Sequence, residues 1–346
     1  MTRLAAGRPV IYFEEPEFEA PRPSLKLRQD GDVTIVTPVL PTSITPGELI
    51  AAQRGLINDF LSTRPFLEPP LLWYYTPMAL PFTRHLDGTR VYDCMDQLAA
   101  FNDAPAELEA LERELLARCA LVFTGGRSLY YAKRQLHFDV SCDPSAVDAA
   151  HFAPTGRTEP PELCALRRPR MVFCGVLDER LDVLFVQGLA RELPDWELVF
   201  VGPTVKIDPA ILPDAPNIHY LGMRSYEELP ALIEHCDIAL LPFALNDATR
   251  FISPTKTLEY LAARKPVIST PIADVVDPYG AEGIVCIAAT PQQAAAYARA
   301  TLREAPSEEW NGAVDRILAT CSWGDTVASM ERRIDSAALL DLEVAG

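Results

Sequence analysis

The chain has 346 residues, of which 49% are hydrophobic and 23% charged, a composition typical of a globular protein large enough for two domains. Its formal net charge of −17 argues against a nucleic-acid partner, because a phosphate backbone is bound by clustered lysine and arginine. The eight cysteines form no C-x-x-C pair and no zinc-ligand pattern. With no apolar run long enough to span a bilayer and no secretory signal, we expect a cytoplasmic protein.

The first half of the chain reads as strands that alternate with helices. Residues 14–31 look like a polar, proline-bearing excursion without regular structure. The expected strands are residues 10–13, 33–37, 71–75, 90–93 and 120–124. The expected helices are residues 46–61, 106–118 and 128–136.

The second half has clearer periodicity. The expected strands are residues 171–174, 198–201, 218–221, 238–241, 267–270 and 284–287. The expected helices are residues 182–191, 226–235, 255–263, 291–303 and 307–320, followed by a last helix to about residue 340. Near-continuous apolar strands between helices predict a parallel sheet covered on both faces, so the domain is Rossmann-like, and the first half looks like another.

Composition shifts suggest where the domains meet. Residues 155–169 are rich in proline and arginine and are the expected interdomain linker. This gives a first domain at residues 1–154 and a second domain at residues 170–322. Residues 323–346 are the expected terminal helix.

The stretch 253–270 carries the strongest functional signal. Ser253 is a natural N-cap, Pro254 fits the first helical position, and Pro266 stops the helix before a buried strand. Lys256 and Glu259 are three residues apart, so they share one face near the helix N-terminus. A lysine at this end attracts phosphate, and a carboxylate one turn on can accept two ribose hydroxyls. An ordinary solvated ion pair is the alternative interpretation.

This stretch resembles the donor-site signature of family 4 retaining glycosyltransferases of the GT-B fold, P-x-K-x-x-E-Y-x-A-x-x-K-P-V. The resemblance implies two Rossmann-like domains with parallel sheets facing a cleft. Residues 1–154 would be the acceptor-side domain, residues 170–322 the nucleotide-sugar donor domain, and residues 323–346 a terminal helix that crosses back to the first domain. It implies that Glu259 holds the ribose of the donor, beside Ser253, Thr255 and Lys256. Phe251 stands where the family often has a second glutamate near the transferred sugar.

Two loops after strands add further candidates for the donor site. Arg180, in the loop that opens with Gly175, lies close to the position of the family's pyrophosphate-binding lysine, although it could simply pair with Asp178 or Asp182. Gly222 ends another strand, near the position that the resemblance implies for the nucleobase.

Candidates from the first half sit at strand ends, where ligands bind in open α/β sheets. Asp93 and Asp96 follow one strand, and a carboxylate there could orient the acceptor hydroxyl. Alternatively, Asp96 could cap the next segment. Gly125 and Gly126 precede a helix whose N-terminus could support an acceptor phosphate.

Together these features predict a glycosyltransferase that moves a sugar from a nucleotide-sugar to a glycan or lipid-linked acceptor, with retention implied by the resemblance. It would act in glycan or surface polysaccharide synthesis. No cofactor is expected, and the chemistry is expected to be independent of metal ions. A small local patch could still allow peripheral membrane association. A GT-B sugar-nucleotide epimerase and a non-catalytic nucleotide-sugar-binding protein remain alternatives.

The start of the chain raises a further expectation. Residues 1–6 read as the tail of a helix ended by Gly7, and the first recognisable strand is residues 10–13. A GT-B acceptor domain normally begins with a central strand before such a helix. We therefore expect that this strand is missing and that the functional protein begins upstream; a reorganised, smaller sheet is the alternative.

Overall fold

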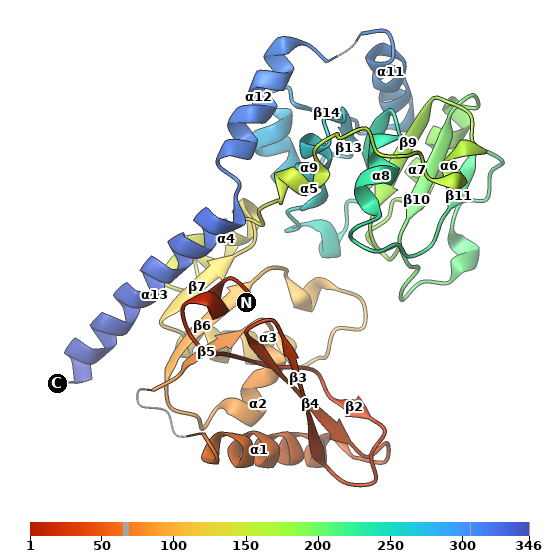
Figure 1. Cartoon of the computed structure of the whole chain (residues 1–346). Helices are drawn as coiled ribbons and strands as arrows, with labels where there is room; N and C mark the ends of the chain where they lie inside the picture. Colours follow the sequence, from red (N-terminus) through yellow and green to blue (C-terminus); the bar gives the residue numbers. More distant parts are fainter. Residues whose placement is uncertain (65–68, 305, 346) are drawn as a thin grey trace. The chain divides into compact units, whose positions relative to one another are not determined.

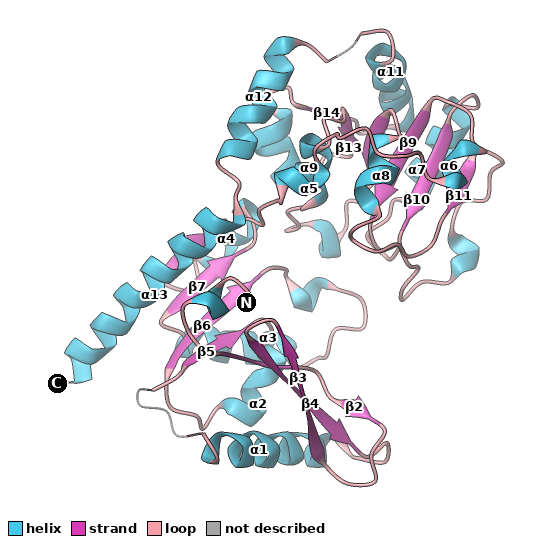
Figure 2. Ribbon diagram, in the orientation of Figure 1, coloured by secondary structure: helices cyan, strands magenta, loops and turns pink. Residues whose placement is uncertain are grey.

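The computed structural model describes residues 1–64, 69–304 and 306–345 (Figures 1 and 2). The chain forms two compact units. The first unit comprises residues 1–93, 106–123 and 327–346, and the second comprises residues 94–105 and 124–326. Both contain parallel strands and helices, which confirms the expected α/β class. The second unit begins earlier than the donor domain expected from the sequence, because it includes residues 94–105 and 124–154.

In the first unit, one sheet is built around β4 (Val33–Leu40), most of whose residues are buried. Strands β1 (Val10–Phe13) and β2 (Glu17–Phe18) pair with β4 in parallel. Strand β3 (Ser24–Asp30) pairs with it antiparallel along its whole length.

The expectation of an irregular excursion over residues 14–31 was wrong, because β3 runs through it. Six of its seven residues are exposed and only Leu25 is half-buried, so the strand lacks the apolar alternation that marks a strand in a sequence. Gly31 has a φ of 57° and turns the chain from β3 into β4, a conformation that glycine adopts without steric cost.

A second sheet of the first unit contains β5 (Leu71–Tyr74), β6 (Thr89–Cys94) and β7 (Leu121–Thr124) in that order. Met330 and Ile334 of α13 (Trp323–Ala345) pack against Val91, Leu121 and Phe123 of these strands. Met330 and Ile334 of the terminal helix therefore belong to the core of the first unit, which includes this helix from residue 327 onward. The other helices of this unit are α1 (Pro46–Ser62), α2 (Leu80–Thr83) and α3 (Leu108–Arg118).

The second unit contains a six-stranded parallel sheet with the order β11-β10-β9-β12-β13-β14. Each of the six strands expected in this half is present within one residue of its expected start. Their bounds are β9 Arg170–Cys174, β10 Glu197–Val201, β11 Ile218–Tyr220, β12 Ile238–Leu241, β13 Val267–Ser269 and β14 Val285–Ile287. Every residue of β9, β10 and β12 is buried, as expected for strands covered on both faces.

Helices surround this sheet, as Figure 2 shows. Asp182 caps α7 by accepting a hydrogen bond from the Phe185 backbone N–H at 2.8 Å. The helices of six or more residues are α4 Arg127–Lys133, α7 Val183–Glu192, α8 Leu229–Glu234, α9 Lys256–Ala262, α11 Pro291–Thr301 and α12 Glu308–Ala319. The shorter elements are β8 Val140–Cys142, α5 Ala149–Phe152, α6 Pro161–Cys164 and α10 Ala273–Val275.

Residues 155–169, the expected linker, are fastened to the second unit. The Glu234 carboxylate accepts hydrogen bonds from the backbone N–H groups of Gly156 at 2.7 Å and Arg157 at 3.2 Å, and pairs with the Arg157 guanidinium at 3.0 Å. Arg170 is buried and donates to the Leu163 carbonyl at 2.6 Å. Charge-assisted hydrogen bonds of this kind are about twice as strong as neutral ones. The segment is thus ordered and hydrogen-bonded to the rest of the second unit, although its role as a linker stays a prediction.

Within the described part of the chain, no helix combines the length and apolar character needed to cross a membrane.

Candidate functional site

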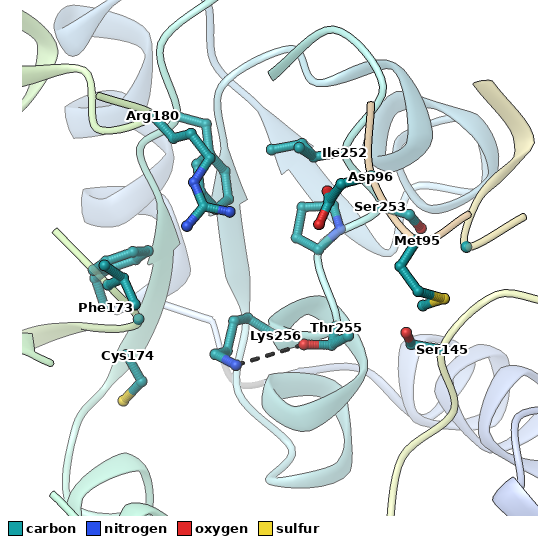
Figure 3. A pocket seen from close by; sticks show the side chains of 15 residues that line it. Met95, Asp96, Ser145, Phe173, Cys174, Arg180, Ile252, Ser253, Thr255 and Lys256 are labelled. Atoms are coloured by element: carbon teal, nitrogen blue, oxygen red, sulfur yellow. Dashed lines mark hydrogen bonds between the residues drawn. The ribbon is translucent and has the colours of Figure 1, made fainter. Parts of the chain in front are cut away.

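A cavity of about 280 Å³ opens in the second unit where several parallel strands end (Figure 3). It lies between the end of β9, the residue Phe243 after β12 and the beginning of α9. Open α/β sheets bind ligands at this edge. The charged side chains that line it are Asp96, Arg180 and Lys256, while Ser145, Ser253 and Thr255 contribute hydroxyl groups.

Lys256 and Glu259 occupy the first turn of α9, on one face as their spacing predicts. The Lys256 Nζ lies 3.6 Å from Glu259 Oε1 and 3.5 Å from Thr255 Oγ1. The Glu259 side chain is only 13% exposed, and its Oε2 is buried without a hydrogen-bond partner among the described residues. Burial raises the pKa of Glu259, although Lys256 lowers it. A solvated surface pair would show neither the burial nor the unsatisfied oxygen.

Helix α9 begins later than expected. Its first residue is Lys256, with Thr255 as the N-cap, so Ser253 is not a capping residue and Pro254 is not at the first helical position. The Thr257 N–H donates to the Pro254 carbonyl at 3.0 Å, so a tight turn precedes the regular helix. Ser253 and Pro254 line the cavity instead.

Arg180 lines the same cavity but is already paired. Its Nε and Nη2 atoms donate to the Asp178 carboxylate at 3.0 and 2.7 Å, so the alternative of an ion pair with Asp178 describes part of its environment. Its backbone carbonyl accepts from the Ala244 N–H at 2.8 Å, and its guanidinium carbon lies 5.6 Å from the Phe101 ring centroid. The guanidinium is therefore held in place while it faces the cavity.

The glycine loops differ in their relation to the cavity. Gly175 lines it. Gly202, which ends β10 with a φ of 146°, approaches so closely that a Cβ there would lie 1.9 Å from the Gly175 carbonyl oxygen. The Gly222 carbonyl accepts a hydrogen bond from the Gly202 N–H at 2.8 Å, and Gly222 is not one of the lining residues.

Asp93 and Asp96 lie in different surroundings. Asp96 lines the cavity, and burial raises the pKa of its carboxyl while Arg180 lowers it. Asp93 is a buried residue of the first unit and accepts a hydrogen bond from the Trp73 indole N–H at 3.2 Å. The lining of the cavity therefore includes Asp96 together with Lys256 and Arg180, and Asp93 is not one of the lining residues.

The N-terminus of α4, a candidate for acceptor phosphate, is already occupied. The Ser128 N–H donates to the Asp274 carboxylate at 3.0 Å, and a Cβ at Gly126 would lie 2.2 Å from that carboxylate. Arg127 pairs with Asp277 at 2.9 Å. The structure does not support the possibility of a phosphate site there, because the Asp274 carboxylate already occupies the place that a bound anion would take at this N-terminus.

Two contributors were not identified from the sequence. Asp178 orients Arg180, and it was considered only as a partner that would make Arg180 a surface residue. Tyr260 is fully buried, and its hydroxyl accepts the Cys174 N–H at 2.7 Å, which ties α9 to the loop that begins at Gly175. The tyrosine in the signature at residues 253–270 was the one feature of the sequence that could have indicated this hydrogen bond.

The arrangement suits an anionic ligand with hydroxyl groups. Lys256 and Arg180 supply two cations at a strand-end cavity, and Glu259 supplies a buried acceptor. Among residues 1–64, 69–304 and 306–345, no group of three histidine, cysteine, aspartate or glutamate side chains is placed to hold a metal ion.

Comparison with known proteins agrees with this geometry. Residues 168–304 match the family model described as glycosyl transferases group 1, and this segment contains most of the cavity. The chain is also 30% identical over 101 residues to the putative teichuronic acid biosynthesis glycosyltransferase TuaH of Bacillus subtilis (strain 168). That match covers 28% of this chain and only 25% of the relative.

Solved structures resemble nearly the whole chain. Sucrose-phosphate synthase from Thermosynechococcus elongatus superposes with a TM-score of 0.68 at 14% identity, covering 100% of this chain and 92% of that one. An E. coli structure titled trehalose-6-phosphate bound with UDP-2-fluoro glucose gives 0.68 at 14% identity, covering 97% and 94%. An α,α-trehalose-phosphate synthase from Burkholderia xenovorans, in complex with glucose-6-phosphate, gives 0.65 at 14%, covering 94% and 93%.

The fold is therefore that of the GT-B glycosyltransferases, which confirms the class implied by the signature at residues 253–270. Within that class, the family model that residues 168–304 match is the one for glycosyl transferases group 1.

Proposed function

We propose that the protein transfers a sugar from a nucleotide-sugar donor to an acceptor hydroxyl group. The observation that carries this proposal is the cavity that brings Lys256 and Arg180 together, with the buried Glu259 carboxylate one turn along α9. In this reading the two cations bind the donor diphosphate and Glu259 accepts hydrogen bonds from the ribose.

The chemistry follows from charge that builds during the reaction. As the bond between the anomeric carbon and the diphosphate oxygen breaks, negative charge grows on the leaving group, and the acceptor oxygen forms the new bond and releases its proton. Lys256 and Arg180 stabilise that growing charge more than they stabilise the bound donor, so they accelerate transfer. The first turn of α9 adds the positive end of its dipole.

Several finer parts of the proposal rest on resemblance. We propose that transfer retains the configuration of the anomeric carbon and is independent of metal ions. We also propose that Asp93 or Asp96 orients the acceptor hydroxyl. The match to TuaH, a putative teichuronic acid biosynthesis glycosyltransferase, supports a role in surface polysaccharide synthesis. The proposal also includes a glycan or lipid-linked acceptor, a cytoplasmic location of the protein and its peripheral association with the membrane.

The test is to incubate the protein with a panel of labelled nucleotide-sugars and candidate acceptors. We expect release of nucleoside diphosphate together with transfer of the label. An isomerised donor without transfer would favour an epimerase, and binding without any reaction would favour a non-catalytic nucleotide-sugar-binding protein; either result would overturn the proposal. Arg191, exposed on α7, provides a matched control, because Arg191→Ala removes a cation away from the cavity.

A further inference from the structure

Each of the two cations that line the cavity has a carboxylate beside it. Arg180 is paired with Asp178 and Lys256 lies beside Glu259, so a carboxylate already accompanies each cation. Asp96 adds a further acidic group to the lining, and Figure 3 shows its carboxylate among the lining side chains together with Arg180 and Lys256. Among the described residues its carboxylate makes no hydrogen bond, and burial raises its pKa.

The rest of the lining offers no further positive charge. Apart from the charged and hydroxyl side chains already named, the described lining is apolar or glycine, and includes Met95, Val176, Phe243 and Ile252. Phe251, at the position where the resemblance implies a sugar-binding carboxylate, is outside the lining, and the Arg250 guanidinium carbon lies 5.1 Å from its ring centroid.

A bound donor diphosphate would occupy the two cations. The group attached to that diphosphate then has Asp96 as its charged neighbour in the cavity, with no cation left to pair with a second anion. A carboxylate can accept hydrogen bonds from sugar hydroxyls, whereas a sugar carboxylate in the same place meets a like charge that the surrounding protein shields less than water does.

We infer that the cavity selects a donor whose transferred sugar is neutral, and that Asp96 determines this specificity by binding its hydroxyl groups and excluding uronate sugars. This inference rests on the proposed function, since it assumes a nucleotide-sugar in the cavity. It gives Asp96 a role toward the donor, which differs from the acceptor role expected from the sequence, because Asp96 lines the same cavity as Lys256 and Arg180.

The experiment compares donors that differ only in the oxidation state of C6. Calorimetry at pH 8 measures the affinity for UDP-glucose against UDP-glucuronate, and for GDP-mannose against GDP-mannuronate. The test uses whichever pair carries the nucleotide base that the protein binds. Two like charges about 5 Å apart in a partly shielded site correspond to roughly 100-fold discrimination, which is the preference for the neutral donor that we expect.

Variants separate charge from shape. Asp96→Asn keeps the size and a hydrogen-bond acceptor but removes the charge, so the preference for the neutral donor should fall at least tenfold. Asp195→Asn, at an exposed aspartate elsewhere in the second unit, should leave the preference unchanged. Circular dichroism and thermal unfolding of each variant confirm that the comparison is made on folded protein.

The outcomes distinguish this inference from the proposed function. Equal affinity of the wild-type protein for the neutral donor and the uronate would overturn the inference alone, as would an unchanged preference in Asp96→Asn. If no donor of the panel and no nucleoside diphosphate binds, the inference and the proposed function both fall.

Discussion

Replacement of Glu259 by alanine tests the donor site most directly, because binding and stability should respond in different ways. A hydrogen bond to a charged group contributes about 1.5–3 kcal/mol, and Glu259 can make two of them to a ribose. The loss of even one, at the lower figure, weakens donor binding roughly tenfold. We therefore expect Glu259→Ala to bind the nucleotide donor at least ten times more weakly, as measured by calorimetry.

Stability should change little in the same variant. The Glu259 Oε2 is buried and unsatisfied, and removal of such a group recovers a desolvation cost of about 1–3 kcal/mol. The variant also loses the attraction to Lys256 at 3.6 Å, which contributes about 1 kcal/mol in a partly exposed pair, and some packing. These losses offset the recovered desolvation cost. The melting temperature should stay within about 3 °C of wild type or rise, and Glu282→Ala, at an exposed glutamate, is the control. Unaltered donor affinity, or a large fall in melting temperature with no specific loss of binding, would refute this role.

Three further predictions concern other residues of the second unit. Lys256→Ala and Arg180→Ala should each lower kcat by about 10²–10³ with a smaller rise in the donor KM, and a wild-type kcat in steady-state assays would remove that residue from the site. Glu234→Ala should lower the free energy of unfolding by about 3 kcal/mol in urea titrations without changing donor affinity, since the residues 155–157 lose their acceptor. The raised pKa of Asp96 means that the folded state holds its proton more tightly, so stability is lost as pH rises through the unfolded and then the folded pKa. Asp96→Asn should thus melt higher than wild type at pH 7.5 and lose that advantage near pH 4, whereas a difference independent of pH would contradict the assigned cause.

The sequence predicted the second unit well for a physical reason. Strands such as β9 and β12 are buried on both faces, so their residues are continuously apolar and stand out from the helices between them. Strand β3 has the opposite character, because nearly all of its residues face solvent and its pairing with β4 is made by backbone groups that carry no sequence signal.

The candidate site was predictable where its residues are close in sequence. Lys256 and Glu259 share a face because they are three apart on one helix, which their spacing reveals. Asp274 reaches the Ser128 N–H from 146 residues away, and no local pattern announces such a contact. The same holds for the hydrogen bond between Cys174 and Tyr260, which are 86 residues apart. Hydrogen-bond partners that are far apart in the sequence are brought together by the topology of the fold, which cannot be read from local patterns in a single sequence.

The close approach of Gly202 to Gly175 has a consequence for engineering. A side chain at Gly202 would collide with the Gly175 carbonyl, whose atoms belong to the backbone and have no rotamer to escape into. A mutant library aimed at new donors should therefore keep Gly202 fixed and vary side chains that line the cavity, such as Val176 and Ile252. Substitutions at Gly202 would yield mostly misfolded clones, while the same number of codons at the lining positions samples altered cavity shapes.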